Sequence, residues 1–123
     1  MPPPYESFWG FLDHLVASNQ LIVDRAKNSH HPHYPEIIYP LDYGYLEKTG
    51  SVDGGGIDVW IGSSGTHDPT ALIMTVDLQK RDAEIKILLG CTEVEMQTIL
   101  DFHNTKTMRA LLLRRTDFKV DEH

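Results

Sequence analysis

Between Tyr43 and Gly90 the apolar residues fall in short runs that glycines and polar turns separate. The runs YGYLEK, IDVWIG and PTALIMTVDL are rich in aromatic and β-branched residues, which is typical of strands. The run AEIKILLG alternates charged with apolar residues and predicts a half-buried strand. This pattern predicts a mainly β core, because side chains return to the same face every two residues in a strand but only about every 3.6 residues in a helix.

Two segments have helical spacing instead. The first lies in the N-terminal segment, residues 1–18, where apolar residues three and four apart predict a helix from about Glu6 to Ala17. The second is TEVEMQTILDFHN, in which Thr92 and Glu95 stand at the spacing of a capping box. The sequence therefore predicts two helices beside the β core.

The remaining segments complete a single domain over residues 1–123. QLIVDR is a short β-branched run and predicts a strand, whereas AKNSHHPHYPEIIYP holds three prolines and predicts irregular structure. MRALLLRR fits either a last strand or a longer second helix. Residues 116–123 form a polar tail that we expect to be loosely held.

Charge and composition exclude several classes of protein. Eighteen acidic residues against eleven basic ones give a net charge of −7, which disfavours nucleic acid and anionic membranes as partners. No apolar run approaches the length of a membrane helix, and the N-terminus has no signal-peptide pattern. Cys91 is the single cysteine, so we expect a cytoplasmic protein. An anionic substrate would need a metal bridge or a focused basic pocket.

The stretch YPLDYGYLEKTGSVDGGGIDVWIG, residues 39–62, resembles the core of the soluble, metal-dependent (family I) inorganic pyrophosphatases. In that family a YP-x-N/D-YG-F/Y segment leads into a DGDP-x-D-V/L loop, and the spacing from tyrosine to aspartate fits here without a gap. Asp77 and Asp82 repeat the spacing of a second acidic pair in the family. The resemblance covers roughly residues 20–90.

The resemblance implies a fold, an activity and a cofactor. The fold would be a mainly β (α+β), small closed OB-like barrel with peripheral helices. The activity would be metal-dependent hydrolysis of inorganic pyrophosphate to orthophosphate. The cofactor would be Mg²⁺, with Mn²⁺ as the alternative, because hard cations prefer carboxylate oxygens. Members of the family form oligomers, so we expect a homo-oligomer.

The resemblance also assigns roles to single residues. Asp58 and Tyr43 would be catalytic. Aspartates would hold the metal ions: Asp53, Asp58, Asp77 and Asp82. Side chains of four kinds would bind pyrophosphate or a small phosphate ligand: Tyr39, Arg25, Lys27, His33 and Lys106.

Several positions depart from the family pattern. Gly55 replaces the middle aspartate of the loop, the residue that would accept a proton from the attacking water, and Gly56 replaces the proline. Loss of a positioned general base typically lowers a rate by about 10²- to 10⁴-fold. Glu84 stands where the family has a lysine, and Lys86 follows two residues later. Glu47 or Glu84 could replace the missing base.

Three functional interpretations therefore stay open. The chain is a hydrolase of phosphoanhydrides, a catalytically weakened relative that binds divalent metal and a phosphate ligand, or a β-barrel interaction domain whose aspartates are turn residues. Arg25 and Lys27 either face phosphate or end a solvated strand. The cluster His30–His33 suits a transition metal or, through His33, a phosphate. Trp60 and Cys91 are expected in the core.

Overall fold

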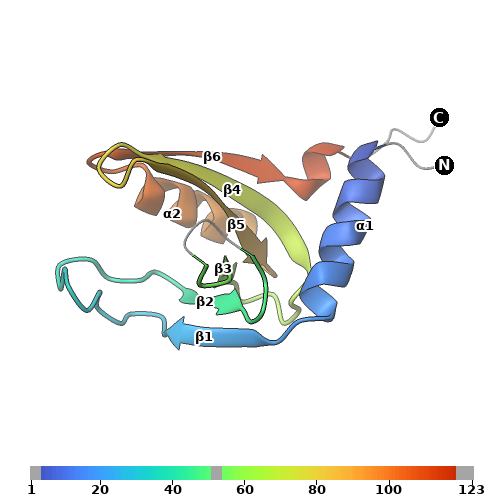
Figure 1. Cartoon of the computed structure of the whole chain (residues 1–123), viewed down its shortest axis with the longest axis horizontal. Helices are drawn as coiled ribbons and strands as arrows, with labels where there is room; N and C mark the ends of the chain where they lie inside the picture. The colour runs from blue at the N-terminus through green and yellow to red at the C-terminus, as the bar shows by residue number, and fades with distance from the viewer. Residues whose placement is uncertain (1–3, 51–53, 119–123) are drawn as a thin grey trace.

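The protein is described here by a computed structural model that covers residues 4–50 and 54–118. Six strands form one sheet in the order β1-β2-β3-β5-β4-β6, and two α-helices lie against it (Figure 1). The elements follow the chain as α1 (Pro4–Ala17), β1 (Leu21–Arg25), β2 (Asp42–Leu46), β3 (Ile57–Ile61), β4 (Pro69–Asp77), β5 (Asp82–Leu89), α2 (Glu93–His103), β6 (Met108–Arg114) and the 3₁₀ turn η1 (Arg115–Phe118). The mainly β fold with peripheral helices is confirmed.

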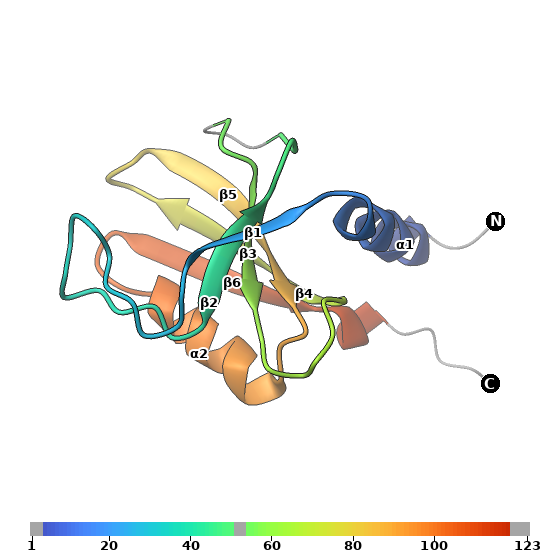
Figure 2. The ribbon, with the colours of Figure 1, turned by 90° about the horizontal axis from the view of Figure 1, so that it is seen from below.

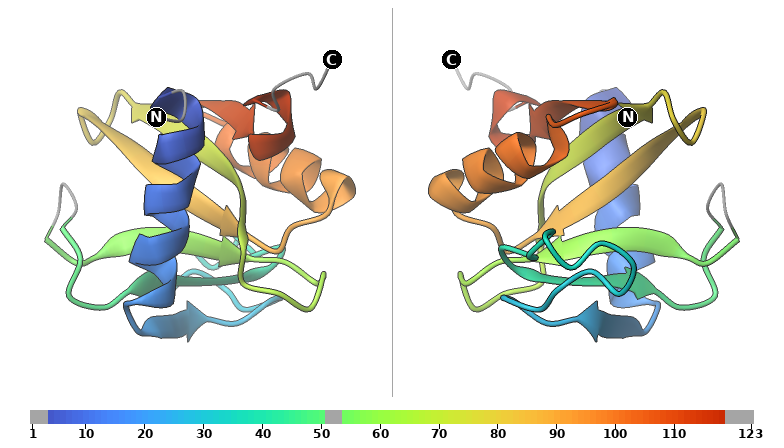
Figure 3. Two further views of the ribbon diagram at one scale, coloured as in Figure 1. Left: turned by 90° about the vertical axis from the view of Figure 1, so that its right-hand side faces the viewer. Right: turned by 90° about the vertical axis from the view of Figure 1, so that its left-hand side faces the viewer.

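The expected closure of the barrel is wrong, because the sheet is open. β1 pairs only with β2 and β6 pairs only with β4, so these two strands form opposite edges of the described sheet. Figure 3 shows α1 running between the two edges. The apolar side chains of Trp9 and Leu12 on this helix pack in a core cluster with strand residues. A helix thus occupies the side on which a closed barrel would need strand pairing.

Each face of the sheet carries a hydrophobic core, because successive residues of a strand point to opposite faces. On one face Trp60, Ile73 and Leu88 pack with residues of α2. On the other face Val59 and Ile87 pack with α1. Figure 2 shows the two helices on different sides of the strands. The prediction that Trp60 and Cys91 are buried is confirmed, with 0% and 5% of their surfaces exposed.

The second helix begins where its sequence predicts. The Thr92 side chain accepts from the backbone N–H of Glu95, and the Glu95 side chain accepts from that of Thr92, so the capping box is present. Glu95 Oε1 also accepts from the backbone N–H of Ser63 at 3.1 Å. One carboxylate therefore caps α2 and fixes it to the loop that follows β3.

The chain ends differ in detail from their prediction. The first helix begins at Pro4, two residues before the expected start, and MRALLLRR forms a strand rather than a longer α2. The expected polar tail begins with the 3₁₀ turn, and Arg115 donates to the Asp13 carboxylate of α1 at 2.6 and 2.9 Å. In residues 4–50 and 54–118, no helix has the length and apolar character needed to cross a membrane.

The close approach of β1 to β2 generates a testable prediction at Gly44. A Cβ atom there would lie directly on the carbonyl oxygen of Ile22, in the backbone of the neighbouring strand. We expect Gly44→Ala to lower the free energy of unfolding by about 1–3 kcal/mol, because the strands must shift apart. Gly10→Ala is the matched control, since its Cβ meets nothing within 4 Å and alanine favours the helix. Urea unfolding measures the free energy of unfolding of both variants. Equal values for Gly44→Ala and Gly10→Ala would contradict the prediction.

Candidate functional site

The register of the central strands places a lysine beside Asp58. β3 and β5 run parallel, and Trp60 lies opposite Leu88. Two residues earlier on each strand stand Asp58 and Lys86, which share a face with that pair because side chains repeat every two residues. A lysine and an aspartate therefore meet in the middle of the sheet.

Lys86 forms the centre of a polar group that we call the Lys86 cluster: Tyr43, Asp58, Glu84 and Lys86. The ammonium Nζ donates to the Tyr43 hydroxyl at 2.8 Å, to Asp58 Oδ2 at 3.0 Å and to Glu84 Oε2 at 3.1 Å. Lys86 is buried, with 6% of its surface exposed. Its three donors are thus all used, as a buried ammonium requires.

The charges in this cluster follow from burial and pairing. Burial lowers the pKa of Lys86, but Tyr43 and the carboxylates of Asp58 and Glu84 outweigh it and raise this pKa above its ordinary value. Burial raises the pKa of Tyr43, more than the Lys86 ammonium lowers it. Near neutral pH the cluster therefore holds a charged ammonium on Lys86 and a neutral phenol on Tyr43.

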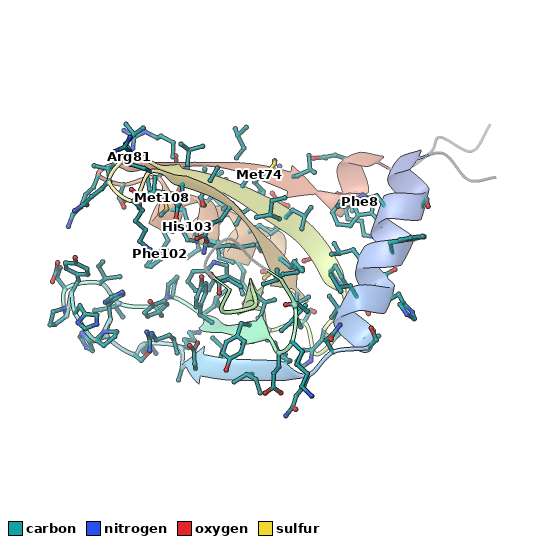
Figure 4. The ribbon with its side chains drawn as sticks, viewed as in Figure 1. Phe8, Met74, Arg81, Phe102, His103 and Met108 are labelled. Atoms are coloured by element: carbon teal, nitrogen blue, oxygen red, sulfur yellow. The ribbon has the colours of Figure 1, made fainter. Side chains whose placement is uncertain are left out.

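A cavity of about 390 Å³ lies against Lys86 and Tyr43, and we call it the basic cavity. Lys86 reaches it from β5, Lys80 from the β4–β5 turn and Lys106 from the α2–β6 loop. Figure 4 shows Phe102 and His103 of α2 between the hairpin turn that carries Arg81 and the loop between β1 and β2. Asp77 is the carboxylate among the described lining residues. Three lysines and one acidic residue line this cavity, and we name it for the lysines, of which Lys86 is also paired with Asp58 and Glu84.

Asp77 organises the turn that carries Lys80. Its Oδ1 accepts from the backbone N–H groups of Gln79 at 2.9 Å and Lys80 at 3.3 Å, and from the Thr107 hydroxyl at 3.1 Å. Burial would raise the pKa of Asp77, but these hydrogen bonds outweigh it and lower the pKa. The carboxylate thus joins the β4–β5 turn to the loop of Lys106.

His103 forms the floor of the basic cavity together with Trp60. The Trp60 Nε1–H donates to His103 Nε2 at 3.0 Å, and the other ring nitrogen, Nδ1, lies 3.3 Å from the Met108 sulfur. Nε2 must be an acceptor, so the neutral ring carries its proton on Nδ1. Burial lowers the pKa of His103 to about 3, and the charge of Lys86 adds to this effect.

A second cavity of about 640 Å³ lies beyond the Lys86 cluster, toward α1. Asp58 and Glu84 line it, and most of its other lining is apolar, including Phe8 and Met74 (Figure 4). Two residues of the Lys86 cluster, Lys86 and Tyr43, thus line the basic cavity, and the other two line the second cavity.

The structure brings part of the predicted site together. Tyr39, Tyr43, Asp77 and Lys106 line the basic cavity. Asp82 lies opposite Asp77 in the β4–β5 pairing, and Asp58 touches Lys86. Asp53 lies outside the described residues.

Three predicted ligand residues are not among those that line the cavity. Arg25 is near enough that its charge lowers the pKa of His31, although burial is the larger cause of that shift. Lys27 is exposed, and its backbone N–H donates to Asp42 Oδ1 at 2.7 Å. His33 is exposed, and its backbone N–H donates to His31 Nδ1 at 3.0 Å.

The described carboxylates do not form a preassembled metal site of three or more ligands. In residues 4–50 and 54–118, no three His, Cys, Asp or Glu side chains converge to hold an ion. Asp77 gives one oxygen to the hairpin, and Asp58 gives one to Lys86. Mg²⁺, however, usually takes one or two protein carboxylates and completes its shell with phosphates and water. Asp58 and Glu84 supply that number.

Sequence reasoning missed two of the three lysines of the basic cavity. Lys80 stands in a turn, where a lysine is ordinarily solvated. Lys86 gives one local signal, because it interrupts the apolar stretch IKILL of a strand. Its partner Asp58 is 28 residues away, and only the β3–β5 register brings the two together.

The buried imidazole of His103 predicts a pH dependence of stability. In the unfolded chain this histidine binds a proton below its ordinary pKa of about 6.5, whereas in the folded protein it stays neutral down to about pH 3. The free energy of unfolding should therefore fall as the pH falls through this window, by about 1.4 kcal/mol per unit from this residue. Urea unfolding between pH 7 and 4 measures the slope.

His103→Gln should make that slope shallower, because glutamine can accept from Trp60 and has no such titration. His14→Gln is the matched control, on the exposed side of α1, and should keep the wild-type slope. Equal slopes in the wild type and in His103→Gln would contradict the prediction.

A solved structure shares this fold. The crystal structure of an inorganic phosphatase from Anaplasma phagocytophilum, at 1.75 Å resolution, matches with a TM-score of 0.55 over 79% of this chain and 84% of that chain. The two sequences are 13% identical, so the likeness concerns the fold. No protein-family model and no curated protein matches the sequence.

Proposed function

We propose that this protein acts on inorganic pyrophosphate, which it binds in the basic cavity and hydrolyses to orthophosphate when Mg²⁺ accompanies the substrate. The observation that carries the proposal is the convergence of Lys80, Lys86 and Lys106 on one cavity of a chain with net charge −7. The likeness of the fold to an inorganic phosphatase supports it.

The three lysines would bind the phosphate oxygens. A lysine ammonium is a compact charge on a flexible side chain. It can therefore bind a phosphate oxygen without the fixed planar geometry that an arginine guanidinium imposes. The positive charge of Lys80 and of Arg25 lowers the pKa of His31, which lines the same cavity, although burial is the larger cause. A cavity of positive potential would also draw an anion past the acidic surface.

The residues of the Lys86 cluster would carry out the remaining steps. Asp58 and Glu84 would hold Mg²⁺, which would neutralise the phosphate oxygens and lower the pKa of a bound water. Tyr43 keeps its phenolic proton and would donate a hydrogen bond to a phosphate oxygen. The metal roles expected for Asp53, Asp77 and Asp82, and the homo-oligomer, stay predictions.

A second candidate function is binding without efficient turnover. Two observations favour it: Gly55 stands where the family has its central aspartate, and Lys86 is paired with the Asp58 carboxylate. In this case pyrophosphate binding would persist while orthophosphate release is slow or absent.

The binding step is tested by Lys106→Asn. Lys106 has a left-handed backbone (φ 54°), which asparagine tolerates, so the change removes the ammonium with little backbone strain. Loss of one charged hydrogen bond should weaken pyrophosphate binding about tenfold in isothermal titration calorimetry. Lys48→Asn is the matched control, because Lys48 is exposed, has φ 62° and lines neither cavity. Equal affinities of both variants would contradict the proposal.

The chemical step is tested by orthophosphate release from pyrophosphate with and without Mg²⁺. We expect release that requires Mg²⁺ and is lost in Asp58→Asn. Gly55→Asp should accelerate it by about 10²- to 10⁴-fold if the loop regains a general base. Binding without release in the wild type would establish the second candidate function. If the wild type and all variants fail to bind pyrophosphate and to release orthophosphate, both candidate functions are overturned.

A further inference from the structure

The basic cavity has a second side whose chemistry pyrophosphate does not use. Besides the lysines, the lining of the cavity includes rings from the β1–β2 loop and from α2. These rings are His31, Tyr34, Tyr39 and Phe102. Pyrophosphate has no apolar atom and no ring, so it would leave these rings without a partner.

We propose that the cavity takes a nucleoside di- or triphosphate, with the phosphates among the lysines and the base against the rings of His31 and Tyr34. The inference rests on the phosphate site of the proposed function and names a larger substrate of that site. The volume of about 390 Å³ lies within the range of small-molecule sites, about 300–1,000 Å³.

The ring of His31 is held in place as a stacking platform. Its Nδ1 accepts from the backbone N–H groups of His33 at 3.0 Å and Tyr34 at 3.2 Å. The neutral ring therefore carries its proton on Nε2, which stays available to donate to a ligand. Its plane lies within 10° of the Tyr39 ring, at a centroid distance of 6.3 Å. A fixed ring loses little conformational freedom when a base stacks on it.

Tyr34 gives the platform a second ring with an accessible face. Its centroid lies 5.2 Å from that of His31, and 54% of its surface is exposed. Tyr39 is 7% exposed and forms the inner wall, so a base would enter from the Tyr34 side. Stacking of one base on aromatic side chains typically strengthens binding by roughly 5- to 150-fold.

The two sides of the cavity are close enough for one ligand. His31 and Lys80 line the same cavity. Phe102 packs against Tyr39 at a centroid distance of 5.9 Å, and Lys106 follows it in the chain by four residues. Phosphates at the lysines and a base at the rings would therefore occupy one continuous space.

The test compares three probes, pyrophosphate, ADP and adenosine, by isothermal titration calorimetry on the full chain at one ionic strength. We expect ADP to bind about tenfold more tightly than pyrophosphate and to be displaced by it. Tyr34→Ala should weaken ADP binding about tenfold and leave pyrophosphate binding unchanged, whereas Lys106→Asn should weaken both. Phe11→Ala, an exposed ring on α1, is the matched control and should change neither.

The outcomes separate this inference from the proposed function. If pyrophosphate binds and ADP binds no more tightly than pyrophosphate, the inference is overturned and the proposed function stands. An equal loss of both ligands in Tyr34→Ala would also overturn it, because the ring would then act on the phosphate end. ADP binding that pyrophosphate does not displace would contradict the shared site.

Discussion

The buried ammonium of Lys86 is the constraint on which the candidate site depends. An unpaired charge in the core would be strongly destabilising, so Tyr43, Asp58 and Glu84 must stay within hydrogen-bond distance. These partners come from β2, β3 and β5, and they meet only in the observed register. A shift of one residue would turn Lys86 to the opposite face, among Val59 and Ile87. The charge therefore selects the strand register, and the register places Lys86 and Tyr43 at the basic cavity.

The basic cavity arises from the same sheet through its connections. Its lysines are dispersed along a chain with net charge −7, and none of them stands beside another in the sequence. The Asp77 carboxylate binds both the turn of Lys80 and the hydroxyl of Thr107, so two separate loops are held together at the cavity. The Leu78 N–H donates to the Thr107 carbonyl at 3.0 Å and adds a backbone link. A residue expected to hold metal thus builds the loops that present the lysines.

The sequence predicted the elements well because their signals are local. Two-residue alternation marked β5, and the capping box marked the start of α2. Tyr39, Tyr43 and Lys106 were predicted as site residues and do line one cavity. Closure of the barrel was predicted wrongly because it depends on whether two edges 83 residues apart, β1 at Arg25 and β6 at Met108, pair with each other. The pairing of Lys86 with Tyr43 and Asp58 was missed for the same reason, since these partners lie 43 and 28 residues away in the chain.

Lys86 also links ligand binding to the state of the carboxylates. Its ammonium supplies the positive charge that Asp58 and Glu84 would otherwise need from a metal ion. The same ammonium lines the basic cavity, so an arriving phosphate would compete with the carboxylates for its three donors. Each hydrogen bond that moves from a carboxylate to a phosphate leaves an oxygen of Asp58 or Glu84 available to a cation. Under the proposed function, affinity for Mg²⁺ would therefore appear together with the substrate.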